Sequence, residues 1–159
     1  MLKISKKGYY SVRAIIDIAS NSQNHPVSLS NISMRQEISL RFLEQLFMKL
    51  RRSKLVKSVR GLGGGYILAK NPKKISIGDI LESVEEPIAP SKICMTSKNG
   101  GKKGENYCNK IDECVSRLVW QKLDEKMKEI LGSISLESLY KEQERLIDKK
   151  NRDHKTNLS

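Results

Sequence analysis

The segment from Ser39 to Leu68, SLRFLEQLFMKLRRSKLVKSVRGLGGGYIL, carries the two patterns that decide the fold. Its first half places apolar side chains at the i, i+3, i+4, i+7 spacing of one helix face, with Ser39 before them as a candidate N-cap. Its second half predicts two short strands, Leu55 to Val59 and Tyr66 to Leu68, on either side of a glycine-rich turn. Glycine permits positive φ and close approach of the backbone to another group. A helix followed directly by such a hairpin predicts a winged domain.

Two shorter helical patterns precede this segment. Residues Tyr9 to Asn21 carry a one-sided apolar stripe, which is typical of an amphipathic helix. Ser28 is a candidate N-cap for a second short helix, which the turn Glu37 to Ser39 ends. The helix after Ser28, the tight turn and the helix after Ser39, which has a polar outward side, together predict a helix-turn-helix. The expected fold is therefore mostly α with a small β-wing, a winged helix-turn-helix domain.

Downstream of the wing the pattern is again helical, except in the loop at 88–111. Ser76 and Asp79 form a pair resembling a capping box at the start of another helix. A longer amphipathic pattern then runs from about Asp112 to Leu131, and Ser135 caps a last helix that is expected to end near Ile147. We therefore divide the chain into a winged domain at 1–87, a cysteine-bearing loop at 88–111, a dimerisation helix with a C-terminal helix at 112–147, and a polar tail at 148–159.

The charge balance points to a polyanion as the partner. The 159 residues carry a formal net charge of +12 at pH 7, and neutralising phosphates with such charges releases condensed counterions. The sequence shows no apolar membrane span and no signal-peptide apolar region, so we expect a cytoplasmic protein that binds no membrane. It also lacks a P-loop and any nucleophile motif, so we expect no enzyme activity. Basic residues expected to meet phosphates, or to remain solvated charges, are Lys49, Arg51, Arg52, Lys54 and Lys57.

The outward side of the helix after Ser39 carries residue types that read base edges. Arg41 can pair with guanine O6 and N7, Gln45 with adenine N6 and N7, and Glu44 can accept from cytosine N4. Arg60 begins the wing turn, and an arginine there suits a narrow minor groove, where the negative potential is enhanced. The plainer alternatives are a solvated charged helix face and an ordinary glycine hairpin. We predict a duplex DNA interface made of Ser39, Arg41, Glu44, Gln45, Arg60, Gly63 and Gly64.

The three cysteines are clustered. Thirteen residues separate Cys94 from Cys108, and five separate Cys108 from Cys114. An odd number leaves no complete disulfide framework, whereas thiolates bind iron-sulfur clusters or zinc, usually with four ligands. One further donor is therefore needed. The alternatives are a metal-free thiol redox sensor and a zinc site completed by Asp, Glu or His. His25 and His154 are expected to be surface residues.

Four strings resemble the IscR/NsrR-type family of dimeric winged-helix regulators, and within it the IscR group. They are ISKKGY from Ile4, SLRFLEQLF from Ser39, LVKSVRGLGGGY from Leu55 and IGDIL from Ile77. The likeness extends to about Leu139. It implies transcriptional control of iron-sulfur biogenesis or stress genes, a dimerisation helix after the third cysteine and a cluster in the loop before it. It also makes Glu44 and Gln45 major-groove readers, Arg60 a minor-groove arginine, and Cys94, Cys108 and Cys114 the cluster thiolates.

The sequence departs from that family at the metal ligands. Arg117 stands where IscR-type members have a histidine ligand, and arginine has no lone pair to donate. Tyr9 stands where nitric-oxide-sensing members have an aspartate, and Lys98 to Gly104 resembles an insertion. The fourth ligand is thus open, and we expect a 2Fe-2S cluster rather than 4Fe-4S. The resulting hypothesis is a homodimeric DNA-binding regulator that senses iron-sulfur status or redox and nitrosative stress. Its rivals are a metal-free or zinc-bound thiol regulator and a basic RNA-binding or architectural protein.

Overall fold

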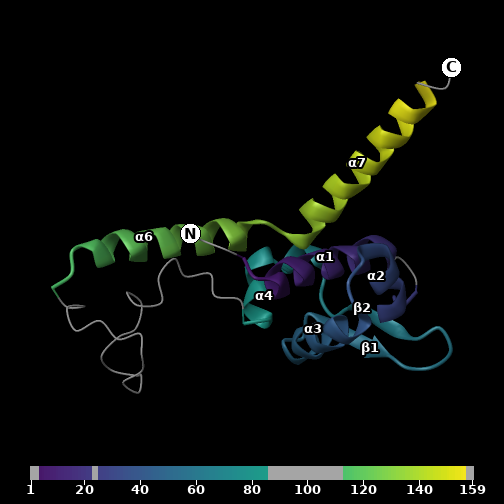
Figure 1. Ribbon diagram of the computed structural model, residues 1–159, viewed down its shortest axis with the longest axis horizontal. Helices are drawn as coiled ribbons and strands as arrows, with labels where there is room; N and C mark the ends of the chain where they lie inside the picture. Colours follow the sequence, from purple (N-terminus) through teal and green to yellow (C-terminus); the bar gives the residue numbers. More distant parts are fainter. Residues whose placement is uncertain (1–3, 23–24, 86–112, 157–159) are drawn as a thin grey trace.

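The computed structural model describes residues 4–22, 25–85 and 113–156. Its fold is mostly helical with one small two-stranded sheet, as the sequence predicted (Figure 1). The loop cysteines Cys94 and Cys108 and the insertion from Lys98 to Gly104 lie outside the described residues. In chain order the elements are α1 (Lys6–Asn21), α2 (Leu29–Gln36), α3 (Leu40–Arg52), β1 (Val56–Val59), β2 (Gly65–Leu68), η1 (Pro72–Lys74), α4 (Ile77–Ser83), α6 (Ser116–Ser133) and α7 (Leu136–Thr156).

One apolar core lies between the helices of the winged domain. It takes the apolar stripes of α1 and α3 together with residues of α2, α4 and the first strand, and it closes against the start of α7. Fully buried side chains in it include Ile15, Ile18, Ile32, Phe47, Ile80 and Leu136. Burying such side chains is the main favourable contribution to folding, at about 25 cal/mol per Å² of apolar surface. The winged domain and the start of α7 therefore share a single core.

Serine side chains cap the helices of this domain. Ser5 Oγ accepts a hydrogen bond from Gly8 N at 3.4 Å, so α1 begins at Lys6, earlier than its apolar stripe indicated. The predicted capping box is present: Ser76 Oγ accepts from Asp79 N at 3.0 Å, and the Asp79 carboxylate accepts from Ser76 N at 2.8 Å. Both arrangements satisfy N–H groups that the first helical turn leaves without partners.

The wing is tied to the helices at its base. β1 and β2 pair antiparallel, with Val56 opposite Leu68 and Val59 opposite Gly65. Val27 and Tyr66 exchange two backbone hydrogen bonds, of 2.9 and 2.8 Å. A Cβ atom on Gly65 would lie 2.4 Å from the carbonyl oxygen of Val27, so only glycine allows this approach. The hairpin therefore starts from a fixed position next to the beginning of α2.

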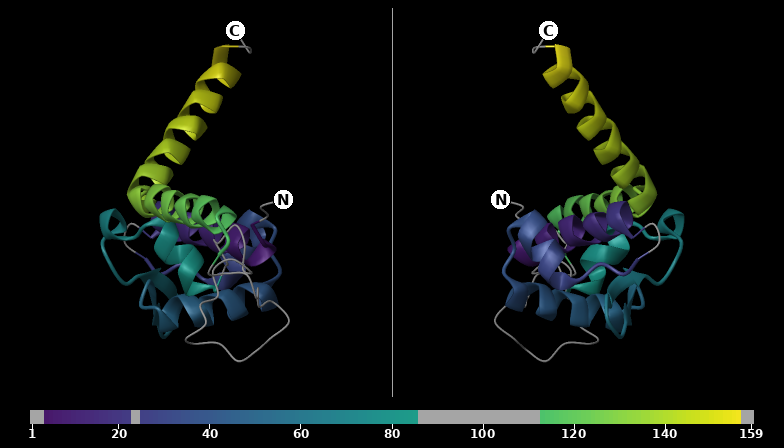
Figure 2. Two further views of the ribbon diagram at one scale, coloured as in Figure 1. Left: turned by 90° about the vertical axis from the view of Figure 1, so that its left-hand side faces the viewer. Right: turned by 90° about the vertical axis from the view of Figure 1, so that its right-hand side faces the viewer.

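The last two helices leave the winged domain from one anchored junction. Ile77 N donates to Ile134 O at 3.0 Å, and Leu136 N donates to Ile75 O at 2.8 Å. Beyond this junction α7 projects away from the domain, as the two views of Figure 2 show. None of the helices in the described part of the chain is long and apolar enough to cross a membrane.

The last helix is longer than its sequence pattern predicted. It was expected to end near Ile147, but α7 continues to Thr156. In the part of the helix before Ile147, ion pairs join neighbouring turns, Lys141 with Glu137 at 3.3 Å and Arg145 with Glu142 at 3.2 Å. Apolar periodicity stops before the helix does, because the final turns bury little: residues 148–153 are all exposed.

Candidate nucleic-acid interface

α3 turns a polar side outward while its apolar side is buried. Leu43, Leu46, Phe47 and Leu50 form the buried side. Arg41, Glu44 and Gln45, at the i, i+3 and i+4 positions of one helix face, are all exposed. The structure thus brings together the three side chains that the sequence singled out for base reading.

Aromatic contacts fix α3 at its first turn and at its middle. The rings of Tyr10 and Phe42 meet edge to face with centroids 5.8 Å apart, which joins α1 to the first turn of α3. The rings of Phe47 and Tyr66 lie 4.8 Å apart and join the middle of α3 to the wing. Ser39 Oγ accepts a hydrogen bond from Phe42 N at 3.3 Å, so this predicted interface residue caps the helix. These contacts place the outward side of α3 in a fixed relation to the wing.

A buried carboxylate holds the turn that leads into α3. Asp17 is 2% exposed and lies on the core side of α1. Its carboxylate accepts from Arg35 Nη2 at 2.5 Å and Nε at 3.0 Å, and from Gln36 Nε2 at 2.9 Å. This two-bond geometry is the strong form of an arginine-carboxylate pair, and the hydrogen bond raises the pKa of Arg35 above its ordinary value. The end of α2 is thereby fixed to α1.

Arg13 adds a second link between α1 and the end of α2. Its Nε donates to Gln36 Oε1 at 3.1 Å and its Nη2 to Gln36 O at 2.9 Å, while its guanidinium lies 5.6 Å from the centre of the Tyr9 ring. Sequence reasoning missed this network. The available signal was a charged residue, Asp17, in the middle of an apolar helix face.

The wing carries Arg60 at the start of its turn, and that side chain is exposed. Gly63 has φ +76°, a conformation that L side chains rarely adopt. Gly64 N donates to Gly61 O at 2.9 Å, and a Cβ on Gly64 would lie 2.5 Å from Val59 O. Gly63 and Gly64 therefore shape the turn that presents Arg60. In Figure 1, α3 and the two strands lie on the side of the domain opposite to α6 and α7.

Several basic residues belong to the end of α3 and the segment that follows it, and Lys49 among them forms an ion pair. Lys49 Nζ donates to the Glu85 carboxylate at 2.5 Å, which joins the end of α3 to the residue that follows α4. That hydrogen bond, and the charge of the ammonium, lower the pKa of Glu85 below its usual range. Exposed cations nearby in the sequence are Arg51, Arg52, Lys54 and Lys57.

Cys114 is the described member of the predicted cluster site. It is half-buried just before α6, and its Sγ lies 3.0 Å from Ser116 Oγ. Hydrogen bonds from the Ser116 hydroxyl and the Arg117 backbone lower the pKa of the thiol, which favours the thiolate that binds metals. This donor chemistry fits an iron-sulfur cluster. Within residues 4–22, 25–85 and 113–156, no three His, Cys, Asp or Glu side chains gather as a metal site.

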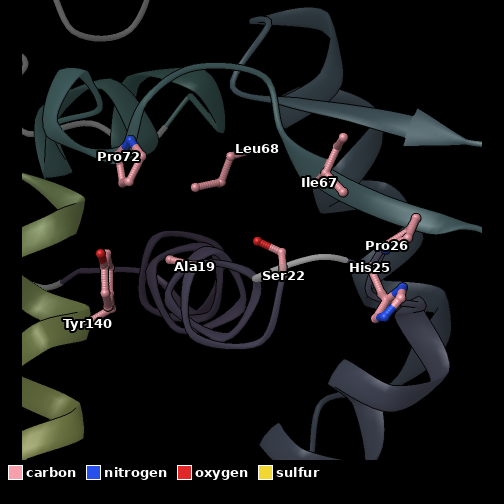
Figure 3. Close-up of a pocket in the computed structure, with 8 residues that line it drawn as sticks. All are labelled: Ala19, Ser22, His25, Pro26, Ile67, Leu68, Pro72 and Tyr140. Atoms are coloured by element: carbon pink, nitrogen blue, oxygen red, sulfur yellow. The ribbon is translucent and has the colours of Figure 1, made fainter.

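A pocket of about 450 Å³ lies between α1, β2, η1 and α7 (Figure 3). His25, at its edge, is exposed, and the hydroxyl groups of Ser22 and Tyr140 also line it. The remaining lining residues are Ala19, Pro26, Ile67, Leu68 and Pro72. Neither a thiol nor a carboxylate belongs to this lining, and His25 contributes an imidazole to it.

A model of the Rrf2 family of iron-dependent transcriptional regulators matches residues 4–142. The chain belongs to the Rrf2 family. It is 41% identical over 143 residues to the HTH-type transcriptional regulator IscR of Xenorhabdus nematophila, a match that covers 90% of this chain and 82% of that protein. The predicted family is therefore confirmed, together with its non-enzymatic role as a transcription regulator.

Solved Rrf2-type structures have the same architecture. The IscR of T. potens matches with a TM-score of 0.69 and 36% identity, covering 91% of this chain and 90% of that one. CymR, the global cysteine regulator of B. subtilis, matches with a TM-score of 0.70 and 35% identity, covering 89% of this chain and 98% of that one. The winged helix-turn-helix fold with its long helix after the wing domain is thus common to this chain and to both regulators.

Proposed function

We propose that this Rrf2-family protein is a homodimeric transcription regulator that reads duplex DNA with α3 and the wing. We further propose that a cluster on Cys94, Cys108 and Cys114 reports iron-sulfur supply or redox and nitrosative stress. The observation that supports DNA reading most directly is the outward side of α3, where Arg41, Glu44 and Gln45 stand exposed beside a fixed wing.

In this proposal α3 enters the major groove. Arg41 donates to guanine O6 and N7, Gln45 pairs with adenine N6 and N7, and Glu44 accepts from cytosine N4. Arg60 enters the neighbouring minor groove, while Gly63 and Gly64 let the wing backbone approach the phosphates. Ser39 contributes as the cap at the N-terminus of α3, which is the end of a recognition helix that meets base edges.

The homodimer is proposed from the exposed apolar side of α6. Val115, Leu118, Val119 and Ile130 are between 58% and 78% exposed, although all four are apolar. An apolar stripe of this length needs a cover, and two-fold pairing with the same helix of a second copy is the commonest solution. A two-fold dimer would present two copies of α3 to a palindromic site.

The cluster proposal uses the position of Cys114 directly before α6. Thiolates of Cys94, Cys108 and Cys114 would hold a 2Fe-2S cluster, with a fourth donor other than Arg117. When bound, the cluster would supply sensitivity to oxidation and to nitric oxide. Because Cys114 adjoins the proposed dimer helix, ligation at this residue would bias how that helix starts.

Fluorescence anisotropy with a palindromic operator and a scrambled duplex tests the DNA-reading part. We expect Gln45→Ala to weaken operator binding by about 1–3 kcal/mol, the range for one bidentate base contact. Binding to the scrambled duplex should change little, because phosphate contacts dominate there. Equal affinity of the unmodified protein for both duplexes at moderate salt would contradict the proposal.

Anaerobic purification tests the cluster. The proposal requires iron, acid-labile sulfide and visible absorbance in the purified protein, and their loss in Cys108→Ser. Specific DNA binding without iron and sulfide would instead support the alternative, a metal-free or zinc-bound thiol regulator of the same fold.

A further inference from the structure

Leu62 stands at the tip of the wing with its side chain entirely in solvent. Its relative exposure is 111%, the highest of any large apolar residue in the described part of the chain. It lies between Gly61, at φ +110°, and Gly63, at φ +76°. A Cβ built on either glycine would meet no atom within 4 Å, so the tip is surrounded by open space. No contact within the protein accounts for this leucine.

Turn chemistry does not account for it either. Turns favour Gly, Asn, Asp, Ser and Pro, each for a backbone reason, whereas leucine brings apolar surface and no turn preference. The glycines on either side already provide the unusual backbone, and the hydrogen bond from Gly64 N to Gly61 O, 2.9 Å long, closes the loop. Singly exposed leucines are common and need no special cause, but this one is held outward by a closed glycine turn.

The surroundings of the tip are cationic. Arg60 is separated from Leu62 by one glycine, and Lys57 lies exposed on the first strand of the same hairpin. These charges draw the tip toward phosphates, and the base of the wing is fixed by the Val27 and Tyr66 pairing. A rigid basic hairpin with an apolar apex matches the way proteins insert apolar wedges between base steps from the minor groove.

We propose that Leu62 enters the minor groove beside Arg60 and wedges against a base-pair step, so that the wing selects a step that opens easily. This inference rests on the proposed DNA-reading function and adds a specificity determinant to it. Arg60 alone favours a narrow groove, such as that of a stiff A-tract. Insertion of a leucine beside it requires the base-pair step to unstack, and flexible pyrimidine-purine steps such as TA unstack easily.

The test uses two operator duplexes that differ only where the wing lands, one with a TA step and one with an A-tract. We expect the unmodified protein to prefer the TA duplex by about tenfold, within the range for one altered base pair. Leu62→Ala should remove that preference or reverse it, because the remaining arginine favours the narrow groove. Arg60→Ala should weaken binding to both duplexes while the preference for TA remains.

Bending provides a second readout. Fluorescence energy transfer between the duplex ends should report a bend that decreases in Leu62→Ala and increases in Leu62→Phe, the larger wedge. Leu62 has no packing to lose, so thermal unfolding of these variants should match the unmodified protein. Leu146→Ala is the matched control, since Leu146 is 61% exposed on α7, away from the wing.

The possible failures are distinguishable. If the unmodified protein binds neither duplex specifically, the proposed function and this inference both fail. If it binds specifically but Leu62→Ala keeps the same step preference and the same bend, DNA reading stands and the wedge is overturned.

Discussion

Lys54 adopts the left-handed backbone region, at φ 56°, in the turn between α3 and β1. This conformation crowds the Cβ of a non-glycine residue and costs about 1–2 kcal/mol. We expect Lys54→Gly to raise the free energy of unfolding by about 0.5–1 kcal/mol, after allowing for the greater freedom of glycine in the unfolded chain. Urea denaturation measures the change.

Lys57→Gly is the matched control for this substitution. Lys57 is also an exposed lysine, but it lies in β1, where glycine should lower stability by about 0.5–1 kcal/mol. Opposite signs at the two positions would establish backbone strain as the cause. A loss of stability in both variants would contradict it.

Asp17 gives the second prediction at the residue scale. Replacing it by alanine removes three hydrogen bonds to a buried carboxylate and leaves Arg35 without that partner. Because Arg35 is 38% exposed and water can replace part of the interaction, we expect a loss of about 2 kcal/mol. Asp79→Ala, at the exposed capping box, should cost about 1 kcal/mol or less by the same urea assay. Equal losses at both positions would contradict the special role of Asp17.

Sequence reasoning found the local features of the site but not the long-range ones. The exposed positions of Arg41, Glu44 and Gln45 follow from helical spacing alone, so they were predictable. Asp17 and Arg35 are 18 residues apart on different helices, and no periodicity within a helix indicates their pairing. The contact exists only once α1 and α2 have packed.

At the scale of elements, Lys49 and Glu85 join the end of α3 to the residue after α4. Glu85→Gln removes the carboxylate charge and frees the Lys49 ammonium for a phosphate. We therefore expect tighter nonspecific DNA binding and a salt dependence steeper by about one unit of slope per freed contact. Anisotropy titrations between low and moderate salt measure this, with Glu82→Gln, on α4 itself, as the control that removes the same charge.

The same pair has a defined pH dependence. The pKa of Glu85 is lowered by Lys49, so any stabilisation is present above the pKa of the unfolded chain and is lost as pH falls through the lower folded value. The stability difference between the unmodified protein and Glu85→Gln should accordingly disappear in acid. A difference that grows toward low pH would have the wrong sign for this pair.

The elements themselves were mostly predictable, because each has a local signal. The wing follows from β-type residues on either side of consecutive glycines, and α4 from the capping pair at Ser76 and Asp79. The end of α7 was not predictable from apolar periodicity, since its last turns bury little. The role of Gly65 also required the structure, because the close approach comes from Val27, far back in the chain.

At the scale of the whole molecule, the single chain leaves the apolar side of α6 uncovered. The sequence indicated it, because so much apolar surface on a lone helix has no use without a second surface. The sequence provided no position in space for the cluster loop relative to α6, and Cys94 and Cys108 lie outside the described residues. Dimerisation and cluster binding are therefore separable in experiment, since apoprotein variants of α6 can be examined alone.

Val119→Glu makes that separation. Val119 is 61% exposed on the apolar side of α6, in the first turn of the helix, so a carboxylate there should leave the fold of one chain intact. A two-fold interface would bury this carboxylate from each of the two copies, and burying unpaired charges costs several kcal/mol. We expect light scattering to show a monomer, and palindromic DNA binding to fall toward the affinity for a half-site. Gln121→Glu adds the same charge about 200° around the helix and should leave both properties unchanged. A dimer that survives Val119→Glu would exclude this side of α6 as the interface.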